Sequence, residues 1–467
     1  MATRTGVADL PLHGGHCPPW LFRRMVELSG GILEAVVLEY GPREVLRRFA
    51  DPFWYQAFGS VLGFDWHSSG LTTTVAGAVK IALAQRGRDL GLFAAGGKGA
   101  TSRRTPREIE TAADRYALAF DPTSLVGASR LAAKVDSVAV QDGFELYHHT
   151  FLFTADGAWA VVQQGMERGG RWARRYHWLG EQVKSFVQEP HSAVCSDRRG
   201  PTLNLVDPES GPARTTIAAL AREERPDAVL RDYRRLLDWL DSGAGREARA
   251  AARAARGVQA ARTARLARAG QLSLLEASAP GATAGGGAAD GAAAAEDSPD
   301  GASRALVRYL SLPAAHAVPD ADRLDRILRR VYERQVPDFQ ALIGLPGVGA
   351  QTVRALSMVA EVVHGVPASF RDPVRYSFAH GGKDGHPYPV DRAAYDRSIR
   401  VLADAVERAR LGDREKLEAT RRLAALAGGS RAGRQAHQLG SVAIPLVLQG
   451  RNRAGTGAVI ADGTLSD

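Results

Sequence analysis

Residues 144–154 read FELYHHTFLFT and residues 158–164 read AWAVVQQ, with Ala155-Asp156-Gly157 between them. Both runs are rich in aromatic and β-branched residues, which favour β-strands. An Asp-Gly pair between two such runs is typical of a tight turn. We therefore expect a β-hairpin here. Shorter strand-like runs follow at Ser192–Cys195 and Leu203–Val206.

Helical patterns flank the predicted hairpin. Residues Thr72–Gln85 carry apolar side chains at helical spacing. Thr105-Pro106-Arg107-Glu108 fits a capping box, with proline at the first helical position, for a helix running to about Phe120. Residues 7–242 are therefore predicted to form one mixed α+β domain, the candidate catalytic domain. A last helix of this domain is indicated by the spacing of Val229, Tyr233, Leu236, Leu237 and Leu240.

The rest of the chain divides into a linker, a helical region and a tail. Residues 243–303 are rich in Ala, Arg and Gly and are predicted to be a disordered linker with a basic stretch. The basic stretch, Gly245–Gly270, could form a helix or stay disordered until it meets a polyanion, whereas Ala277–Ala302 cannot bury a core. Residues 304–430 are predicted to form a second, all-α domain, and residues 431–467 a C-terminal tail. The helices of the predicted all-α domain are expected at Asp320–Arg334, Asp338–Ile343, Gln351–His364, Asp391–Ala409 and Arg414–Leu426.

A glycine-rich turn, Leu345-Pro346-Gly347-Val348-Gly349, joins two of these helices. Asp338 is expected to cap the first helix, and Gly344 to end it in a left-handed conformation. Glycines let a backbone approach another molecule closely, and the amides at a helix N-terminus favour an anion. A DNA phosphate fits such a site without any base being read. We therefore predict phosphate contacts at Gly347, Val348, Gly349 and Thr352.

This stretch resembles the helix-hairpin-helix motif of DNA repair and processing proteins. The resemblance implies DNA binding through the phosphate backbone, without sequence specificity. Leu342, Leu345 and Val348 would form the small core that the two helices share. The alternative is a plain pair of antiparallel helices with a glycine-rich turn.

A further resemblance is to the DNA glycosylases that contain this motif. Tyr388-Pro389-Val390-Asp391 is similar to the segment that ends in their catalytic aspartate, which would make Asp391 catalytic. The segment between the hairpin helix and Asp391 is longer than in that family. Gln351 stands where the bifunctional members have a lysine, so no Schiff-base chemistry is expected. The alternative for Asp391 is a helix cap.

Composition supports a polyanionic partner. Lys plus Arg number 60 and Asp plus Glu 51, which gives a formal charge of +9 and favours nucleic acid first and an anionic membrane surface second. Two cysteines, Cys17 and Cys195, cannot form a disulfide framework and favour a reduced setting. No apolar run of about 18 residues predicts a membrane span. We expect a cytoplasmic, nucleoid-associated protein without membrane partners.

Polar and glycine-rich runs recur through the first half of the chain. They are Pro11–Gly15, Phe64–Gly70, Gly96–Gly99, Gln141–Phe144, Tyr147–His149 and Ala160–Met166. On these runs the chain is similar to an uncharacterised family, labelled domain of unknown function 763, over nearly its full length apart from the linker. That resemblance supplies no activity, so chemistry has to be inferred from the residues.

Acidic and histidine residues gather in and beside the predicted hairpin. Asp and His together can hold Mg²⁺ or Mn²⁺ for phosphodiester hydrolysis, so Asp136, Asp142 and His148 are predicted metal ligands. Neighbouring strand residues point to opposite faces, so only one of His148 and His149 can join a site. His177 and His191 could complete the site or be structural. The candidate catalytic residues are His67, Asp136, Asp142, Glu145, His148, Gln163 and Asp391.

A second candidate anion site lies at Gly96-Gly97-Lys98-Gly99. Backbone amides, a helix start at Thr105 and nearby cations would together form a phosphate cradle. The Gly-Lys-Ser/Thr spacing of a P-loop is absent. The alternative is a solvated basic loop. The side chains expected to bind phosphate here are Lys98, Ser102, Arg103 and Arg104.

Three functions remain open at this point. The first is a DNA-processing enzyme, with a metal-dependent phosphodiesterase or nuclease site in the first domain. The second is a non-enzymatic DNA-binding adaptor, because Gln271-Leu272-Ser273-Leu274-Leu275 resembles the pentapeptides that dock bacterial repair proteins on the sliding clamp. The third is an enzyme that acts on a small phosphorylated ligand at Lys98.

Overall fold

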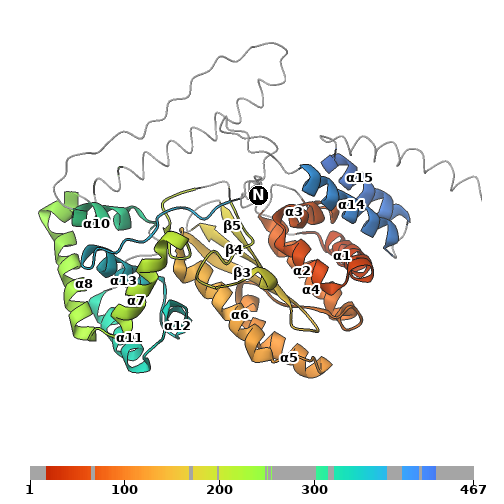
Figure 1. Cartoon of the computed structure of the whole chain (residues 1–467). Helices are drawn as coiled ribbons and strands as arrows, with labels where there is room; N and C mark the ends of the chain where they lie inside the picture. Colours follow the sequence, from red (N-terminus) through yellow and green to blue (C-terminus); the bar gives the residue numbers. More distant parts are fainter. Residues whose placement is uncertain are drawn as a thin grey trace, which may run out of the picture.

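The computed structural model describes residues 17–64, 69–167, 172–196, 199–247, 250, 254, 301–313, 320–375, 392–409 and 413–427. There the chain is a mixed α+β protein, mostly helical, with a five-stranded antiparallel sheet (Figure 1). The mixed class expected from the sequence is confirmed. Several predicted features lie outside the described residues: His67, Asp391, Gln271–Leu275, most of the 243–303 linker and the 431–467 tail.

The sheet contains the predicted hairpin. Its strands, in spatial order, are β1 (Leu92–Lys98), β3 (Phe144–Thr154), β4 (Trp159–Glu167), β5 (Ala173–Leu179) and β6 (Ala193–Cys195). Strands β3 and β4 form the hairpin, in which Phe153 pairs with Trp159. Gly157 in the turn has φ +83°, a left-handed conformation that glycine adopts readily. Two short strands, β2 (Val140–Gln141) and β7 (Leu203–Asn204), pair separately.

The two faces of the sheet are covered by different helices. His148 pairs with Gln164 and His149 with Gln163, so the two histidines point to opposite faces, as expected. Four N-terminal helices cover the His148 face: α1 (Pro19–Tyr40), α2 (Pro42–Ala50), α3 (Pro52–Val61) and α4 (Gly70–Leu90). Two helices and a π-helical turn cover the other: α5 (Thr105–Tyr116), α6 (Pro122–Lys134) and η2 (Val135–Ala139).

Helix α5 begins where expected but without the predicted capping box. Thr105 lies inside the helix and does not cap it. The Glu108 carboxylate instead accepts hydrogen bonds from Lys80 Nζ at 2.6 Å and from the Gly96 amide at 2.7 Å. Glu108 is therefore engaged in tertiary contacts and is not available for the capping box. The helix ends at Tyr116, earlier than predicted.

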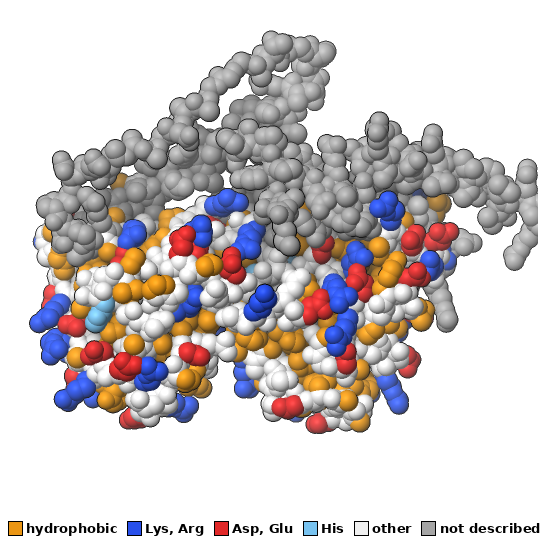
Figure 2. Space-filling view, viewed as in Figure 1, with side chains coloured by type: hydrophobic (Ala, Val, Ile, Leu, Met, Phe, Trp, Pro, Cys, Tyr) orange, Lys and Arg blue, Asp and Glu red, His pale blue; other side chains and the backbone are white. Residues whose placement is uncertain are grey.

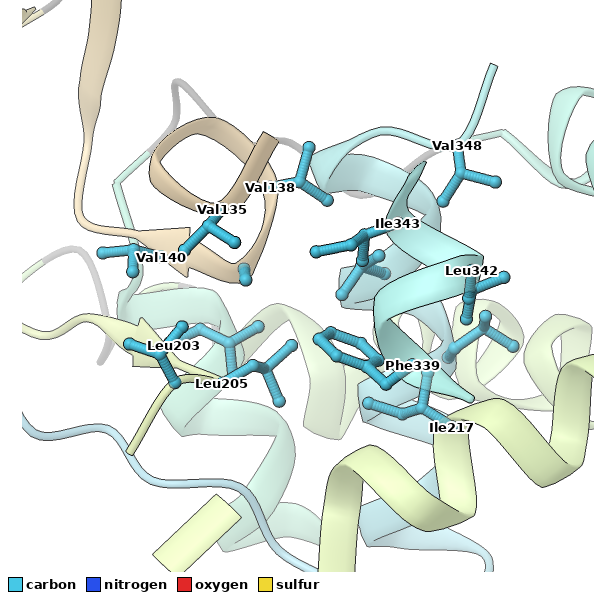
Figure 3. Close-up of a cluster of buried hydrophobic side chains, with 14 of the residues drawn as sticks. Val135, Val138, Val140, Leu203, Leu205, Ile217, Phe339, Leu342, Ile343 and Val348 are labelled. Atoms are coloured by element: carbon cyan, nitrogen blue, oxygen red, sulfur yellow. The ribbon is translucent and has the colours of Figure 1, made fainter. Parts of the chain in front are cut away.

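Helices from both sides of the linker share one hydrophobic core. Those before it are α7 (Gly211–Arg222) and α8 (Pro226–Asp241), and those after it are α10 (Gly301–Ser311), α11 (Ala321–Arg334), α12 (Phe339–Gly344) and α13 (Ala350–Val362). One buried cluster joins Val138, Leu205 and Ile217 to Phe339 and Ile343 (Figure 3). The buried cluster therefore contains residues from both the predicted 7–242 domain and the predicted 304–430 domain.

The last two described helices pack elsewhere. Helices α14 (Arg392–Arg408) and α15 (Asp413–Ala427) lie beside α1 and α3 (Figure 1). Leu402 and Leu423 are buried in the cluster formed by the N-terminal helices, and Arg422 Nε donates to the Val61 carbonyl at 2.7 Å. The described helices of the predicted 304–430 domain thus contribute to two hydrophobic clusters.

Among the described helices, none is long and apolar enough to cross a membrane. The longest two, α1 with 22 residues and α4 with 21, pack against each other. Their buried sides include Leu28, Ile32, Val75 and Val79, so their apolar residues serve the core.

Candidate functional site

The turn between α12 and α13 has the conformation that its glycines suggested. Asp338 caps α12, as predicted, by accepting a hydrogen bond from the Ala341 amide at 2.8 Å. The Val348 amide donates to the Leu345 carbonyl at 3.3 Å, and Gly347 has φ +92°. These features match a type II turn with glycine at its third position. Gly344 is the last residue of α12 and does not have the left-handed conformation predicted for it. The residue of this turn that has a positive φ is Gly347.

A small core holds the turn between its two helices. Leu342 and Val348 are almost fully buried together with Leu356 of α13, while Leu345 is partly buried (Figure 3). This agrees with the shared core expected from the sequence. Val363, the residue after the last turn of α13, is exposed.

Two contacts tie the turn to the mixed part of the fold. Lys134 Nζ, at the end of α6, donates to the Val348 carbonyl at 2.6 Å. Gln141 Nε2, in β2, donates to the Ala350 carbonyl at 2.8 Å. The turn is therefore held from behind by residues far away in the sequence, and its outer backbone keeps a fixed geometry.

The outer side of the turn is open to solvent. Pro346 and Gly347 are exposed, and among the residues that the structure describes no acceptor is found for the amides of Gly347 and Gly349. A Cβ placed on Gly347 would lie 3.2 Å from the guanidinium of Arg330, which is itself exposed. Thr352 is only 2% exposed, so its side chain is poorly placed for the predicted phosphate contact.

A groove opens directly beside this turn. Its volume is about 1110 Å³, and it lies between α6, the start of β3 and α12. Arg130 and Lys134 line it from α6, Glu145 from β3 and Pro346 from the turn. The predicted catalytic residue Glu145 is thus on the surface of this groove, apart from the buried acids described below.

The predicted phosphate cradle at Gly96–Gly99 is largely committed to internal contacts. The Gly96 amide donates to Glu108, and the Ser102 hydroxyl donates to the Gly99 carbonyl at 2.6 Å. A Cβ on Gly96 would lie 2.2 Å from the His149 carbonyl oxygen, so this glycine is required for close approach of β1 to β3. The cations that remain exposed along the loop are Lys98, Arg103 and Arg104.

Asp136 is at the centre of a buried hydrogen-bond network. It is 0% exposed and sits on the π-helical turn η2, a rare structure that often marks functional positions. Its Oδ2 accepts from Gln163 Nε2 at 2.6 Å and Trp178 Nε1 at 2.9 Å, while Oδ1 lies 2.5 Å from His191 Nε2. Burial raises the pKa of Asp136, and the charge and hydrogen bond of His191 oppose that shift.

Asp142 is also fully occupied by protein donors. Its Oδ2 accepts from Arg174 Nη1 at 2.8 Å and from the Tyr176 hydroxyl at 2.6 Å, and its Oδ1 accepts from the Phe144 amide. Arg174 also bonds Asp372 at 2.9 Å. Although burial works against the charged form, these carboxylates hold the pKa of Arg174 above its usual value.

The structure does not bring the three predicted metal ligands together. His148 lies on the opposite face of the sheet from the Asp136 network, where its Nε2 bonds the Thr150 hydroxyl at 2.9 Å. The oxygens of Asp136 and Asp142 are held by donors that a cation would have to displace. Within the described ranges, no group of three or more His, Cys, Asp or Glu side chains could hold a metal ion. His148 therefore does not meet Asp136 at one site in the described structure, and the expected Mg²⁺ or Mn²⁺ stays a prediction.

Gln163 connects Asp136 to a second histidine. Its Nε2 also lies 3.2 Å from the Ala132 carbonyl, so this atom faces two acceptors and must be the donor. Its Oε1 therefore accepts from His149 Nδ1 at 2.8 Å, and His149 Nε2 accepts from the Ser129 hydroxyl at 2.9 Å. Burial lowers the pKa of His149 to about 4, which keeps the ring neutral. The positions of the protons along this network are thereby fixed.

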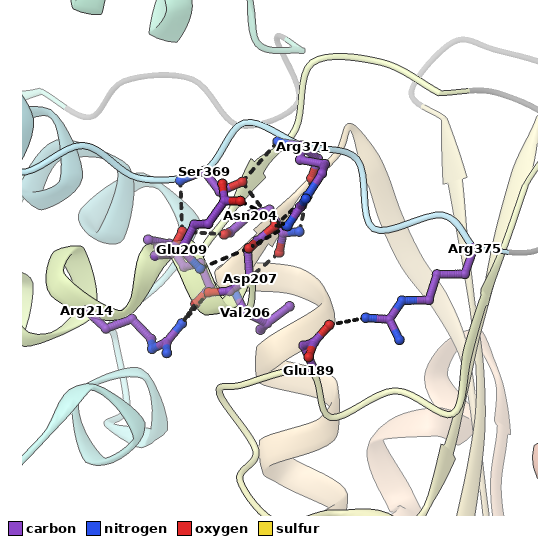
Figure 4. Close-up of polar contacts among 11 residues, drawn as sticks. Glu189, Asn204, Val206, Asp207, Glu209, Arg214, Ser369, Arg371 and Arg375 are labelled. Atoms are coloured by element: carbon purple, nitrogen blue, oxygen red, sulfur yellow. Dashed lines mark hydrogen bonds and ion pairs between the residues drawn. The ribbon is translucent and has the colours of Figure 1, made fainter. Parts of the chain in front are cut away.

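A polar pocket of about 380 Å³ opens at the His191 end of the network. One of its walls is the chain that leaves α13 and returns to the sheet, where Ser369 bridges Asn204 of β7. Two ion pairs stand at this wall: Arg371 bonds both oxygens of Asp207, and Arg375 bonds Glu189 (Figure 4). The pocket therefore brings together parts of the chain from both sides of the linker.

Several residues around Asp136 and Asp142 carry no sequence-based prediction. Arg174 and Tyr176 bond Asp142, and Trp178 bonds Asp136, whereas the sequence left a functional and a structural role open for His191. All seven residues of β5, which read ARRYHWL, are buried. Two adjacent arginines inside an aromatic strand-like run were the available signal, because buried arginines require buried acids.

Residues 6–390 match the model of a family described as "Protein of unknown function (DUF763)". The chain belongs to this family. The match covers the sheet, the His191 pocket and the α12–α13 turn, so all of these are features within the matched region. No curated protein and no solved structure matches the chain.

Proposed function

We propose that this protein binds DNA through the phosphate backbone, without sequence specificity, at the turn between α12 and α13. The observation that carries the proposal is the exposed backbone at Gly347 and the half-buried backbone at Gly349, whose amides have no acceptor among the described residues, beside the exposed guanidinium of Arg330. A helix of 13 residues begins at Ala350, so its dipole adds to the attraction for an anion. A role in DNA repair or processing, where many sequences are met, suits such a grip.

The distribution of charge is consistent with a local contact. Basic side chains on the face seen in Figure 2 are interspersed with acidic ones rather than gathered in one continuous patch. The overall charge of +9 therefore supports general attraction to a polyanion, while the orientation of DNA would depend on the turn and its neighbours. Arg130 and Lys134, in the adjoining groove, extend the positive side of this region.

The test measures affinity for labelled duplex DNA by fluorescence anisotropy across a range of salt concentrations. Because released counterions drive phosphate binding, log affinity should fall with log salt, with a slope of roughly −0.9 for each phosphate contacted. The Gly347→Ala plus Gly349→Ala variant should weaken binding, since a methyl group at each position blocks close approach of a phosphate. Arg330→Gln should make the slope of log affinity against log salt shallower by roughly 0.9, the contribution of one phosphate contact.

Matched controls separate the turn from general effects. Gly365→Ala changes another left-handed glycine, with φ +69° and open space around it, away from the turn. Arg88→Gln removes an exposed arginine on α4. Both should bind like the unmodified protein. Binding that is insensitive to salt, or equal loss in Gly365→Ala and the double variant, would mean that the turn does not hold DNA.

A further inference from the structure

His191 and Asp136 have the arrangement of a proton-accepting pair. Asp136 Oδ2 is fixed by Gln163 and Trp178, so Oδ1 is the atom left to face His191 Nε2, at 2.5 Å. A carboxylate in this position holds the proton of the imidazole on Nε2. The other ring nitrogen, Nδ1, then carries the lone pair. A carboxylate that orients an imidazole in this way prepares it to act as a base.

The free nitrogen of His191 belongs to a residue that lines the polar pocket. No partner for Nδ1 is present among the described residues, whereas Nε2 is committed to Asp136. The His191 ring packs against the indole of Trp178, with centroids 4.6 Å apart, so its orientation is fixed from two sides. The pocket, at about 380 Å³, is large enough for a small polar group and lies in the size range of ligand sites.

Arg199 is the cation of this pocket that the protein itself leaves unpaired. Within the described part of the chain it has no acidic partner, and it is exposed at the pocket. The other charged groups at the walls are already matched, because Glu189 pairs with Arg375, Asp207 with Arg371, and Asp372 with Arg174. An anionic group entering the pocket would therefore find one guanidinium without an acidic partner among the described residues and, in the lining of the same pocket, one oriented imidazole.

We infer that His191, positioned by Asp136, is a general base for hydrolysis of a phosphate ester, with Arg199 contacting the phosphoryl oxygens. In this step a water oxygen forms a bond to phosphorus while its proton passes to His191 Nδ1. The bond from phosphorus to the leaving oxygen breaks, and that oxygen takes a proton from solvent. The imidazolium returns its proton to solvent, so the net change is the addition of one water. Nothing in this step depends on DNA being held at the α12–α13 turn.

Two sources of a phosphate ester fit this chemistry, a nucleic acid strand and a small phosphorylated molecule. The full-length protein is incubated with bis(p-nitrophenyl) phosphate, p-nitrophenyl phosphate, labelled single-stranded and duplex DNA, and a 5′-mononucleotide. Each probe is tested with Mg²⁺, with Mn²⁺ and with chelator. Hydrolysis of the diester and DNA assigns the nucleic acid source, and release of phosphate from the monoester and mononucleotide assigns the small molecule.

The variants distinguish a catalytic role from a structural one. His191→Gln should lower kcat by at least about a hundredfold, the usual contribution of a general base. Arg199→Gln should mainly raise KM, and it alters an exposed side chain, so the fold should be retained. Asp136→Asn should lower kcat with little change in KM, because the base is misoriented while the pocket stays intact. His364→Gln and Arg88→Gln, at exposed positions away from the pocket, are the controls.

Each result has a defined meaning. Hydrolysis that falls in His191→Gln and Arg199→Gln, with melting temperatures near that of the unmodified protein, supports the assignment. Hydrolysis of no probe, or hydrolysis that His191→Gln leaves unchanged, overturns it. DNA binding is measured on the same samples, so loss of cleavage with retained binding counts against this pocket and not against the function proposed for the turn.

Discussion

Lys134 and Val348 are joined by a hydrogen bond of 2.6 Å, although 214 residues separate them in the sequence. The ammonium group at the end of α6 reaches the carbonyl oxygen in the middle of the exposed turn. This bond fixes the inner side of the turn while the Gly347 amide stays outside. The geometry proposed to hold DNA thus depends on a residue of the mixed α+β part of the fold.

Replacing Lys134 with methionine should therefore affect both stability and DNA binding. The Val348 carbonyl would lose its donor, which costs about 1–3 kcal/mol for a buried group. We expect a lower free energy of unfolding in urea and a weaker affinity for duplex DNA. Lys184→Met, at an exposed position in the segment between β5 and β6, should change neither the stability nor the affinity. An unfolding curve for Lys134→Met that superimposes on the control would contradict the role of this bond.

Arg174 should be one of the most sensitive positions in the molecule. It is 1% exposed and bridges Asp142 and Asp372, so Arg174→Leu leaves two carboxylates without their cation. Breaking a buried ion pair in this way costs about 3–5 kcal/mol. The stability of Arg174→Lys should lie between those of the unmodified protein and Arg174→Leu, since lysine keeps the charge but not both contacts. Arg88→Leu serves as the exposed control, and equal melting temperatures for the two leucine variants would refute the prediction.

Buried neutral histidines should make the protein less stable in acid. Burial lowers the pKa of His148 to about 3 and that of His149 to about 4, both from a usual value of 6.5. The unfolded chain then binds more protons than the folded one between pH 6.5 and about 4, so stability falls as pH falls through this window. For His149 the loss is up to about 3 kcal/mol.

The measurement is the free energy of unfolding as a function of pH. His148→Gln should flatten the acid limb, because the variant has no proton to gain at that position. His364→Gln, which replaces an exposed histidine, should leave the pH dependence as it is. A limb that is equally steep in all three proteins would show that these histidines do not control acid stability.

Two nearby glycines, Gly96 in β1 and Gly99 just after it, should respond differently to alanine. Gly96 has φ +88° and no room for a Cβ, which would lie 2.2 Å from the His149 carbonyl oxygen. Gly99 has φ +59° with open space around it. Gly99→Ala should cost only the backbone strain, about 1–2 kcal/mol, whereas Gly96→Ala must also separate β1 from β3 and should cost more. The measurement is the thermal unfolding temperature of each variant, which should be lower for Gly96→Ala than for Gly99→Ala. A lower unfolding temperature for Gly99→Ala would contradict the register of β1.

The sequence predicted best those features that depend on neighbouring residues. The β3–β4 hairpin followed from aromatic and β-branched runs around an Asp-Gly turn, and the Asp338 cap from its place before a short helix. The α12–α13 turn followed from glycine spacing. Each of these is decided within a few residues, where propensity and turn chemistry act directly.

Features decided by distant partners were missed or misassigned. Glu108 fits a capping box locally, but Lys80 and the Gly96 amide compete for its carboxylate. Asp136 and Asp142 have the chemistry of metal ligands, yet Trp178 and Arg174 occupy their oxygens from another strand. The sequence does not show which donor will face a given acid, so it located polar clusters without resolving what they bind.

The chain that leaves α13 also has a thermodynamic consequence. The same stretch begins at the end of the helix behind the turn and ends as a wall of the His191 pocket, where Asp372 is bonded to Arg174. A molecule bound in the pocket would contact this stretch directly, and one bound at the turn would contact the other end of the same helix. If a ligand in the pocket raises the affinity of the protein for DNA, then bound DNA must raise the affinity for that ligand by the same factor, because the two binding equilibria are linked. The two ends would then behave as reciprocal effectors joined by one covalent strap.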